Sequence, residues 1–187
     1  MAQVFGRRPV LFLKLFFIAA LLATATAWIT LYKALPPQGG DLSPAQPIAF
    51  SHKHHSGDDG IDCRYCHTSV ERSSFAGIPS TEICMSCHAQ LFADAPMLEP
   101  LRESARTGIP IRWMRVHDLP DFVFFDHSIH VNKGVDCRQC HGRVERMPRM
   151  MRVASLEMQW CLDCHRAMAR ERQLDERRLT DCSTCHR

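Results

Sequence analysis

After its first 47 residues the sequence has no excess of either charge and few long apolar runs. Residues 1–47 contain four of the 23 basic residues and one of the 20 acidic residues, so residues 48–187 carry 19 of each sign. This balance excludes the strongly basic surface with which proteins bind nucleic acids. We therefore expect no nucleic-acid partner.

The one long apolar run lies near the N-terminus. Leu15 to Tyr32 has no charged residue and would span about 27 Å as a helix, close to a bilayer core of about 30 Å. Arg7 and Arg8 precede the run, which places the N-terminus in the cytoplasm by the positive-inside rule. We expect residues 1–34 to be a retained anchor in the cytoplasmic (inner) membrane, with the rest of the chain on the periplasmic, outer side. The alternative is a cleaved signal peptide, because small residues between Ala23 and Ala27 suit a signal peptidase.

No cysteine lies outside one pattern, Cys-x-x-Cys-His, which occurs five times. Two thiols on one helical turn can each bond a vinyl group of a haem, and the next residue can bind the iron. Zinc sites use two Cys pairs per metal, so five pairs and a histidine after each of them argue against zinc, and disulfides leave the histidines unexplained. The sequence predicts five covalently bound haem c groups. The attachment cysteines are Cys63, Cys66, Cys84, Cys87, Cys137, Cys140, Cys161, Cys164, Cys182 and Cys185, and the proximal iron ligands are His67, His88, His141, His165 and His186.

The chain also repeats itself. A Phe-x-His-x-x-His element precedes the first and third motifs, and the two copies are offset by 75 residues at the histidines and 74 at the cysteines. This predicts two two-haem modules, about 48–92 and 121–170, followed by a fifth haem at 171–187. Together they form a pentahaem domain over residues 48–187, after a Pro/Gly-rich linker at 35–47.

Six histidines remain for the distal side of the irons. Two imidazoles three residues apart can serve two neighbouring haems, so we expect distal ligation by the repeated histidines, which are His52, His55, His127 and His130. His54 has no counterpart in the second copy, where Ile129 stands, and is expected to be solvated. For the fifth haem we favour His117, with Met158 as the alternative.

With both axial positions filled, no iron has a site for a small substrate. The chain is then an electron-transfer protein and not an enzyme on its own. Its 140 residues after position 47 leave about 28 per haem, too few for a conventional core. We expect a mainly α, haem-cored fold with short helices and extensive irregular loops, together with the N-terminal transmembrane helix.

The two histidine elements with their motifs resemble the class III, cytochrome c3/c7-like multihaem proteins. Over residues 10 to 187, the segments around His117 and from Met158 to His165 look like the pentahaem subunit of alternative complex III. That resemblance implies a membrane complex that oxidises quinol and passes electrons to a cytochrome or terminal oxidase. It also implies three kinds of partner, namely an iron–sulfur subunit, quinol-binding integral membrane subunits and a monohaem cytochrome c.

Two other functions compete with this one. A stand-alone, membrane-anchored quinol dehydrogenase feeding a periplasmic reductase would need one haem with an open or weak distal position. A multihaem reductase would carry an unusual proximal ligand, whereas all five motifs here end in histidine.

Overall fold

The computed structural model describes residues 6–34 and 42–186 and divides the chain into two units, Met1–Gly40 and Asp41–Arg187. The first unit contains one helix, α1 (Arg7–Ala34). Its span Arg8–Tyr32 has a mean hydropathy of 2.2 and no buried residue, so it is long and apolar enough to cross a membrane, although a signal sequence also meets that criterion. The hydroxyl groups of Thr24, Thr26 and Thr30 donate to carbonyls of the preceding turn, which satisfies the polar atoms of this segment.

The second unit is built from short helices joined by irregular loops, and the described residues contain no strand. In chain order, its elements are the π-helix η1 (Lys53–Asp58), α2 (Cys63–Cys66), α3 (Thr81–His88), the 3-10 helix η2 (Pro96–Leu98), α4 (Glu99–Thr107), α5 (His127–Asn132), α6 (Cys137–His141), the 3-10 helix η3 (Val144–Arg146), α7 (Met158–Arg172), α8 (Glu176–Thr180) and α9 (Cys182–Cys185). The mainly helical fold that the sequence predicts is confirmed.

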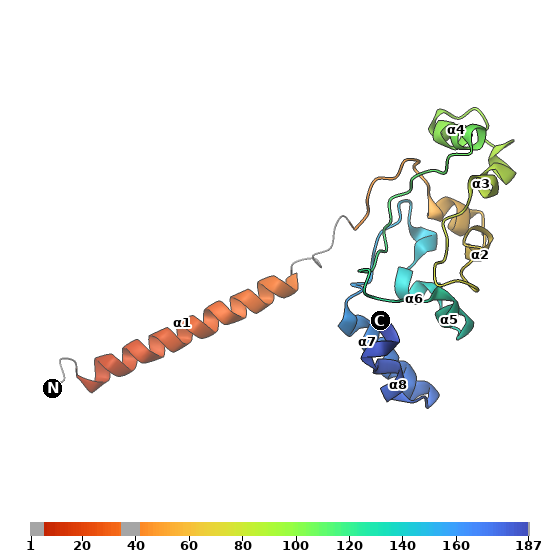
Figure 1. Ribbon diagram of the computed structural model, residues 1–187. Coiled ribbons are helices and arrows are strands. Elements are labelled where there is room, and N and C mark those ends of the chain that lie inside the picture. The colour runs from red at the N-terminus through yellow and green to blue at the C-terminus, as the bar shows by residue number, and fades with distance from the viewer. Residues whose placement is uncertain (1–5, 35–41, 187) are drawn as a thin grey trace. The chain divides into compact units, whose positions relative to one another are not determined.

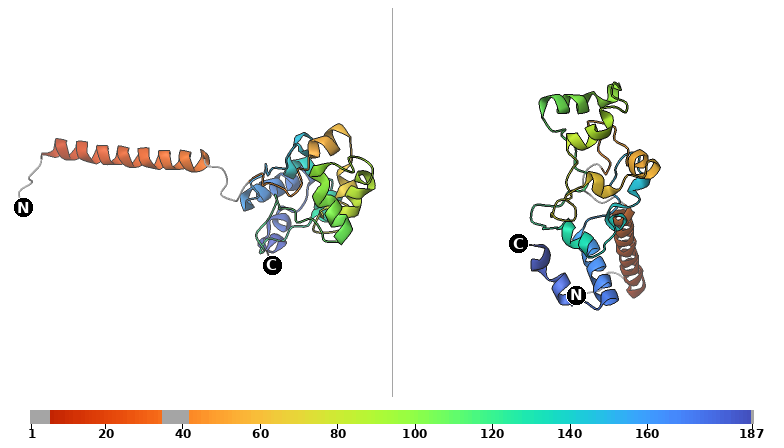
Figure 2. Two further views of the ribbon diagram at one scale, coloured as in Figure 1. Left: turned by 90° about the horizontal axis from the view of Figure 1, so that it is seen from above. Right: turned by 90° about the vertical axis from the view of Figure 1, so that its right-hand side faces the viewer.

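The motif helices of this unit do not follow one another in chain order. From the end that carries α4, the order is α3, α2, α6 and α7, which Figure 1 and the right-hand view of Figure 2 show alike. Helix α8 packs against α7, and α9 follows it near the C-terminus. The second motif of the sequence therefore lies at one end of the row.

Few apolar side chains are buried. One small cluster consists of Ile48, Leu98 and Leu101, with Trp113 packed against it. No described side chain has less than 2% of its surface exposed, and half-exposed apolar residues are spread over the whole unit. A protein core of this size would not by itself offset the conformational entropy of ordering a domain of about 150 residues. The arrangement suits a domain whose apolar surfaces pack on a large cofactor.

Most of the predicted 35–47 linker lies outside the described residues, which resume at position 42. The described part is bound to the second unit. Arg152 donates its main-chain N–H to the carbonyl of Leu42 at 2.8 Å, and the Gln46 side chain exchanges two 2.9 Å hydrogen bonds with the main chain of Met114. Residues 42–46 therefore belong structurally to the domain.

Candidate haem-binding site

Three of the five motif helices begin at an aspartate directly before the first cysteine. The carboxylates of Asp62, Asp136 and Asp181 each accept a hydrogen bond from the main-chain N–H two residues later, at 2.8, 2.7 and 2.9 Å. Such N-caps satisfy the free N–H groups of a helix that is only four or five residues long. They thereby hold both cysteines of a motif within one turn.

The two Phe-x-His-x-x-His elements have the same geometry. Phe50 stacks on His55 at 4.5 Å between ring centres and meets His52 edge-on at 4.9 Å. In the second copy, Phe125 stacks on His130 at 4.5 Å and meets its other histidine edge-on at 4.8 Å. The sequence repeat is therefore also a structural repeat, in which one phenylalanine fixes both histidine rings.

The first copy contains one residue more than the second between its histidines and its motif. The structure accommodates this residue in the backbone of the histidine element, since η1 is a π-helix and the matching α5 is an α-helix. A π-turn holds one additional residue per turn. The extra residue is thus absorbed while the contacts of Phe50 remain those of Phe125.

Predicted distal and proximal histidines lie close to one another in three pairs. The distances between ring centres are 6.1 Å for His55 and His88, 6.3 Å for His127 and His141, and 6.1 Å for His130 and His165. Imidazole nitrogens bind a first-row metal ion at about 2 Å, so two rings on opposite sides of one ion have centres about 6 Å apart. The three pairs fit bis-imidazole ligation of an iron.

The sequence repeat predicts a fourth pair, His52 with His67. The repeat makes His52 equivalent to His127 and makes His67 equivalent to His141. Burial, and to a lesser extent the neighbouring His67, lower the pKa of His52 to about 4. Its Nδ1 atom is buried with no hydrogen-bond partner among the described residues. A buried, neutral imidazole beside a proximal histidine fits an iron ligand.

The predicted ligands of the fifth haem are not brought together as a pair. His186 donates through Nδ1 to the carbonyl of Phe122 at 3.1 Å and stacks on the ring of the same residue at 5.9 Å. His117 lies elsewhere, with its Nε2 atom 3.3 Å from Nδ1 of His141. Burial lowers the pKa of His117 to about 4, with His141 adding to the effect. Met158 is exposed at the first position of α7.

His54 differs from the paired histidines. It is exposed, and its ring nitrogens face the carboxylates of Asp58 and Asp59 at 3.9 and 3.7 Å. The main contacts of its ring are therefore with acidic groups at the surface.

Cysteines of different motifs lie next to one another. Burial raises the pKa of one thiol in each of four such pairs, and the cysteine of another motif raises it further. The pairs are Cys63 with Cys137, Cys66 with Cys87, Cys140 with Cys164, and Cys161 with Cys185. They link the motif helices in the order α3, α2, α6, α7, α9.

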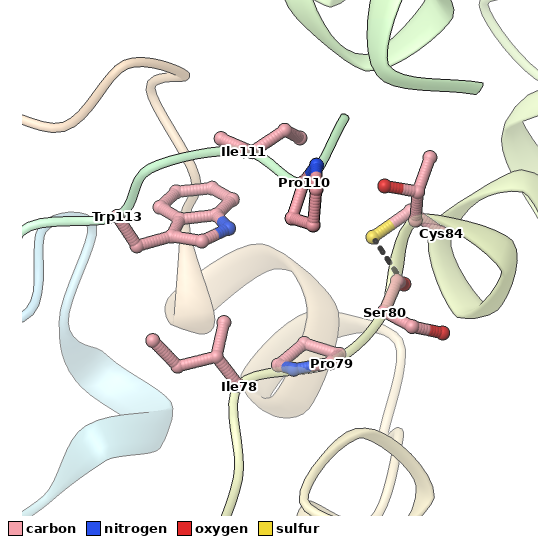
Figure 3. Close-up of a pocket in the computed structure, with 8 residues that line it drawn as sticks. Ile78, Pro79, Ser80, Cys84, Pro110, Ile111 and Trp113 are labelled. Atoms are coloured by element: carbon pink, nitrogen blue, oxygen red, sulfur yellow. Dashed lines mark hydrogen bonds between the residues drawn. The ribbon is translucent and has the colours of Figure 1, made fainter. Parts of the chain in front are cut away.

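Two apolar hollows border the second motif. One, of about 290 Å³, is walled by Ile78, Pro110, Ile111 and Trp113, and the Cys84 thiol lies in its wall, 3.8 Å from the carbonyl of Ser80 (Figure 3). The other, of about 330 Å³, is lined by Ile61, Asp62, Tyr65 and Cys87. Motif thiols in apolar walls, together with the opposed imidazoles, fit covalently bound haem.

Sequence reasoning missed the groups that orient the histidines. His67 donates through Nδ1 to Gly77 at 2.7 Å and His165 to Leu179 at 2.8 Å, in each case to a main-chain carbonyl. Main-chain acceptors have no residue signature, so no signal was available for them. The aspartate caps did carry one, an Asp directly before Cys in three motifs.

Comparisons with known proteins point to multihaem cytochromes c. Residues 123–187 match the family described as cytochrome c7 and related cytochrome c. The protein named "Menaquinone reductase, multiheme cytochrome c subunit" from Nitratidesulfovibrio vulgaris (strain Hildenborough) is 37% identical over 134 residues. The match covers 70% of this chain and 60% of that relative, so the chain spans about three fifths of the relative's length. The later part of the domain is therefore cytochrome c7-like, as predicted, and c-type cytochromes bind haem covalently.

Proposed function

We propose that this chain is a membrane-anchored pentahaem cytochrome c that passes electrons from quinol oxidation, within a respiratory complex, to a downstream cytochrome or terminal oxidase. The observation that carries the proposal is the set of opposed histidine rings at 6.1–6.3 Å, each joining a distal element to a motif. Rings held on both sides of an iron leave no position for a substrate, which favours electron transfer over catalysis.

The residues divide into three roles. Haem c, when bound, supplies an iron that takes up and gives back one electron. The ten motif cysteines hold it covalently, and the motif histidines serve as proximal ligands. The distal ligands are His52, His55, His127 and His130, and the predicted candidates for the fifth haem are His117 and Met158.

The arrangement of the motifs supports transfer along the chain. Neighbouring thiols join each motif helix to the next, so the five sites form one row from α3 to α9. Electrons would move through this row between a donor at one end and an acceptor at the other.

The partners follow from relatives and resemblance. The relative from N. vulgaris is named as one subunit of a menaquinone reductase, which favours a multi-subunit complex over the stand-alone dehydrogenase. That name describes electrons moving toward menaquinone, while the resemblance to alternative complex III implies quinol oxidation. In either case an iron–sulfur subunit, integral membrane subunits that bind quinol and a monohaem cytochrome c are the proposed neighbours.

The proposed location of the chain follows from its N-terminal helix. Helix α1 would span the cytoplasmic membrane once, with Arg7 and Arg8 on the cytoplasmic side and the haem domain on the periplasmic side. A haem domain tethered in this way would be held at the membrane surface, where integral membrane subunits could supply its electrons.

The test is to solubilise native membranes in mild detergent, follow the chain by haem stain on a native gel and identify its neighbours by mass. A large assembly with an iron–sulfur protein and several membrane subunits supports the proposal. A chain migrating alone, or with a single reductase, overturns it in favour of the stand-alone quinol dehydrogenase. Adding a quinol to the isolated assembly then tests direction, since quinol oxidation requires the haems to become reduced.

A further inference from the structure

Most of the predicted iron ligands share one kind of Nδ1 partner. Seven of them donate to main-chain carbonyl oxygens, and these are His55, His67, His88, His127, His130, His165 and His186. A carbonyl can only accept, so each of these rings carries its proton on Nδ1 and keeps the lone pair of Nε2 for a metal. Two predicted ligands differ. The Nδ1 atom of His52 is buried without a hydrogen-bond partner among the described residues. The Nδ1 atom of His141 instead faces Nε2 of His117 at 3.3 Å.

The need for a free Nε2 lone pair also fixes the direction of the hydrogen bond between His141 and His117. This proximal histidine lies opposite His127, with ring centres 6.3 Å apart and planes within 8° of parallel. For His141 to present the Nε2 lone pair to an iron, its proton must lie on Nδ1. His117 is then the acceptor, and its own Nε2 lone pair is occupied by this hydrogen bond.

The position of His117 also separates it from the fifth haem. The chain leaves His117 beside α6 and reaches α9 only at Phe122 and Phe124, which contact His186 and Cys185. The ring of His117 lies 4.3 Å from that of His141, whereas no contact joins it to His186 among the described residues. His117 therefore belongs to the third haem site.

We propose that His117 is a positioning residue that accepts a hydrogen bond from Nδ1–H of the proximal ligand His141 and does not itself bind iron. This role rests on the haem sites proposed above and revises the predicted ligation of the fifth haem, for which Met158 is then the remaining candidate. Acceptors behind a metal-bound histidine fix its tautomer and orientation and raise its basicity.

The consequence is specific to one haem. An imidazole nitrogen is a more basic acceptor than the carbonyl oxygens that serve seven of the other predicted ligands, so His141 becomes more electron-rich. A more electron-rich ligand stabilises the oxidised iron and lowers the midpoint potential of the third haem. The bis-imidazole ligation of that haem is unchanged, and its spin state stays low.

The test uses the intact membrane complex with His117→Leu, which removes the acceptor, and His117→Gln, whose amide oxygen can accept near the position of Nε2. Haem content, electron paramagnetic resonance and a redox titration are measured for each. We expect full haem content and low-spin iron in both variants. One midpoint potential should rise in His117→Leu, and His117→Gln should restore it in part. His127→Leu is the positive control, because loss of a true axial ligand gives a high-spin signal.

Two results overturn the proposal. A high-spin ferric signal from one haem in either variant would make His117 an iron ligand. Low-spin haems with every potential unchanged in His117→Leu would show that the hydrogen bond has no effect on His141. If His117→Leu does not accumulate, His117→Gln decides alone, since glutamine would not replace an iron ligand. A protein without covalent haem would refute the proposed function itself, which distinguishes that failure from failure of this inference.

Discussion

Replacement of His55 tests the proposed ligation most directly, because the neighbouring His54 is not a predicted iron ligand and can serve as a control. In His55→Leu, the ring that lies 6.1 Å from His88 is removed while its volume is largely kept. Only the haem of the second motif should lose its distal ligand, since the sequence repeat assigns His52 to His67. About one fifth of the total haem should therefore become high-spin in the ferric state, given five motifs.

The structural cost of this change is small enough to leave a folded protein. His55 stacks on Phe50 at 4.5 Å, and loss of an aromatic contact costs about 0.5–1.5 kcal/mol. Domains of this size are typically stable by about 5–15 kcal/mol. We expect full haem content by the pyridine haemochrome assay, so the spin change can be measured against an intact set of haems.

His54→Leu is the matched control. The ring of His54 is exposed and faces two carboxylates at 3.7–3.9 Å, contacts worth at most about 1 kcal/mol at a surface. It also meets the His55 ring edge-on, with 5.4 Å between ring centres. Its electron paramagnetic resonance spectrum should equal that of the unaltered protein. Identical spectra for both variants, or a high-spin signal in His54→Leu alone, would refute the pairing of His55 with His88.

Three further changes test the packing around the haem sites. In Gly57→Ala the new Cβ would lie 2.2 Å from the carbonyl oxygen of Glu145, and the required shift of η1 from η3 should cost about 1–3 kcal/mol, seen as a lower midpoint of guanidinium unfolding. Asp136→Ala removes the cap on the main-chain N–H of Arg138 and should cost about 1 kcal/mol in the same assay, whereas Asp136→Asn should lose much less. Phe125→Leu frees the two rings that contact it, so two low-spin signals should shift while haem content is kept; a shift in none or in all five would contradict the contacts.

Much of the proposed site could be predicted from the sequence because its parts are local. The five motifs each fix a thiol pair and an imidazole within one turn. The repeated Phe-x-His-x-x-His element predicts four of the distal histidines. The lengths of the motif helices also follow local rules. Helix α6 ends at Gly142, which has a φ of 70°, while α7 continues after its motif through Ala167, Ala169 and Arg170, all good helix formers.

The contacts that depend on tertiary structure could not be predicted. The carbonyl acceptor for His127 is Ser74, 53 residues away, and that for His186 is Phe122, 64 residues away. His117 was assigned by counting the histidines left over, a procedure with no information on which ring it would meet. The one-residue offset in the repeat predicted an insertion, yet only the backbone shows that it becomes a π-turn in η1.

If each motif holds a haem as proposed, the order of the motif helices arranges the five sites in series. The third motif, on α6, lies in the middle of the row. Loss of its haem would interrupt electron transfer between the two haems on either side, whereas loss of the haem at α3 would only shorten the row. The two ends of the row are the second and fifth motifs, at α3 and α9. A donor and an acceptor that dock at those two ends would exchange every electron through the centre of this one chain.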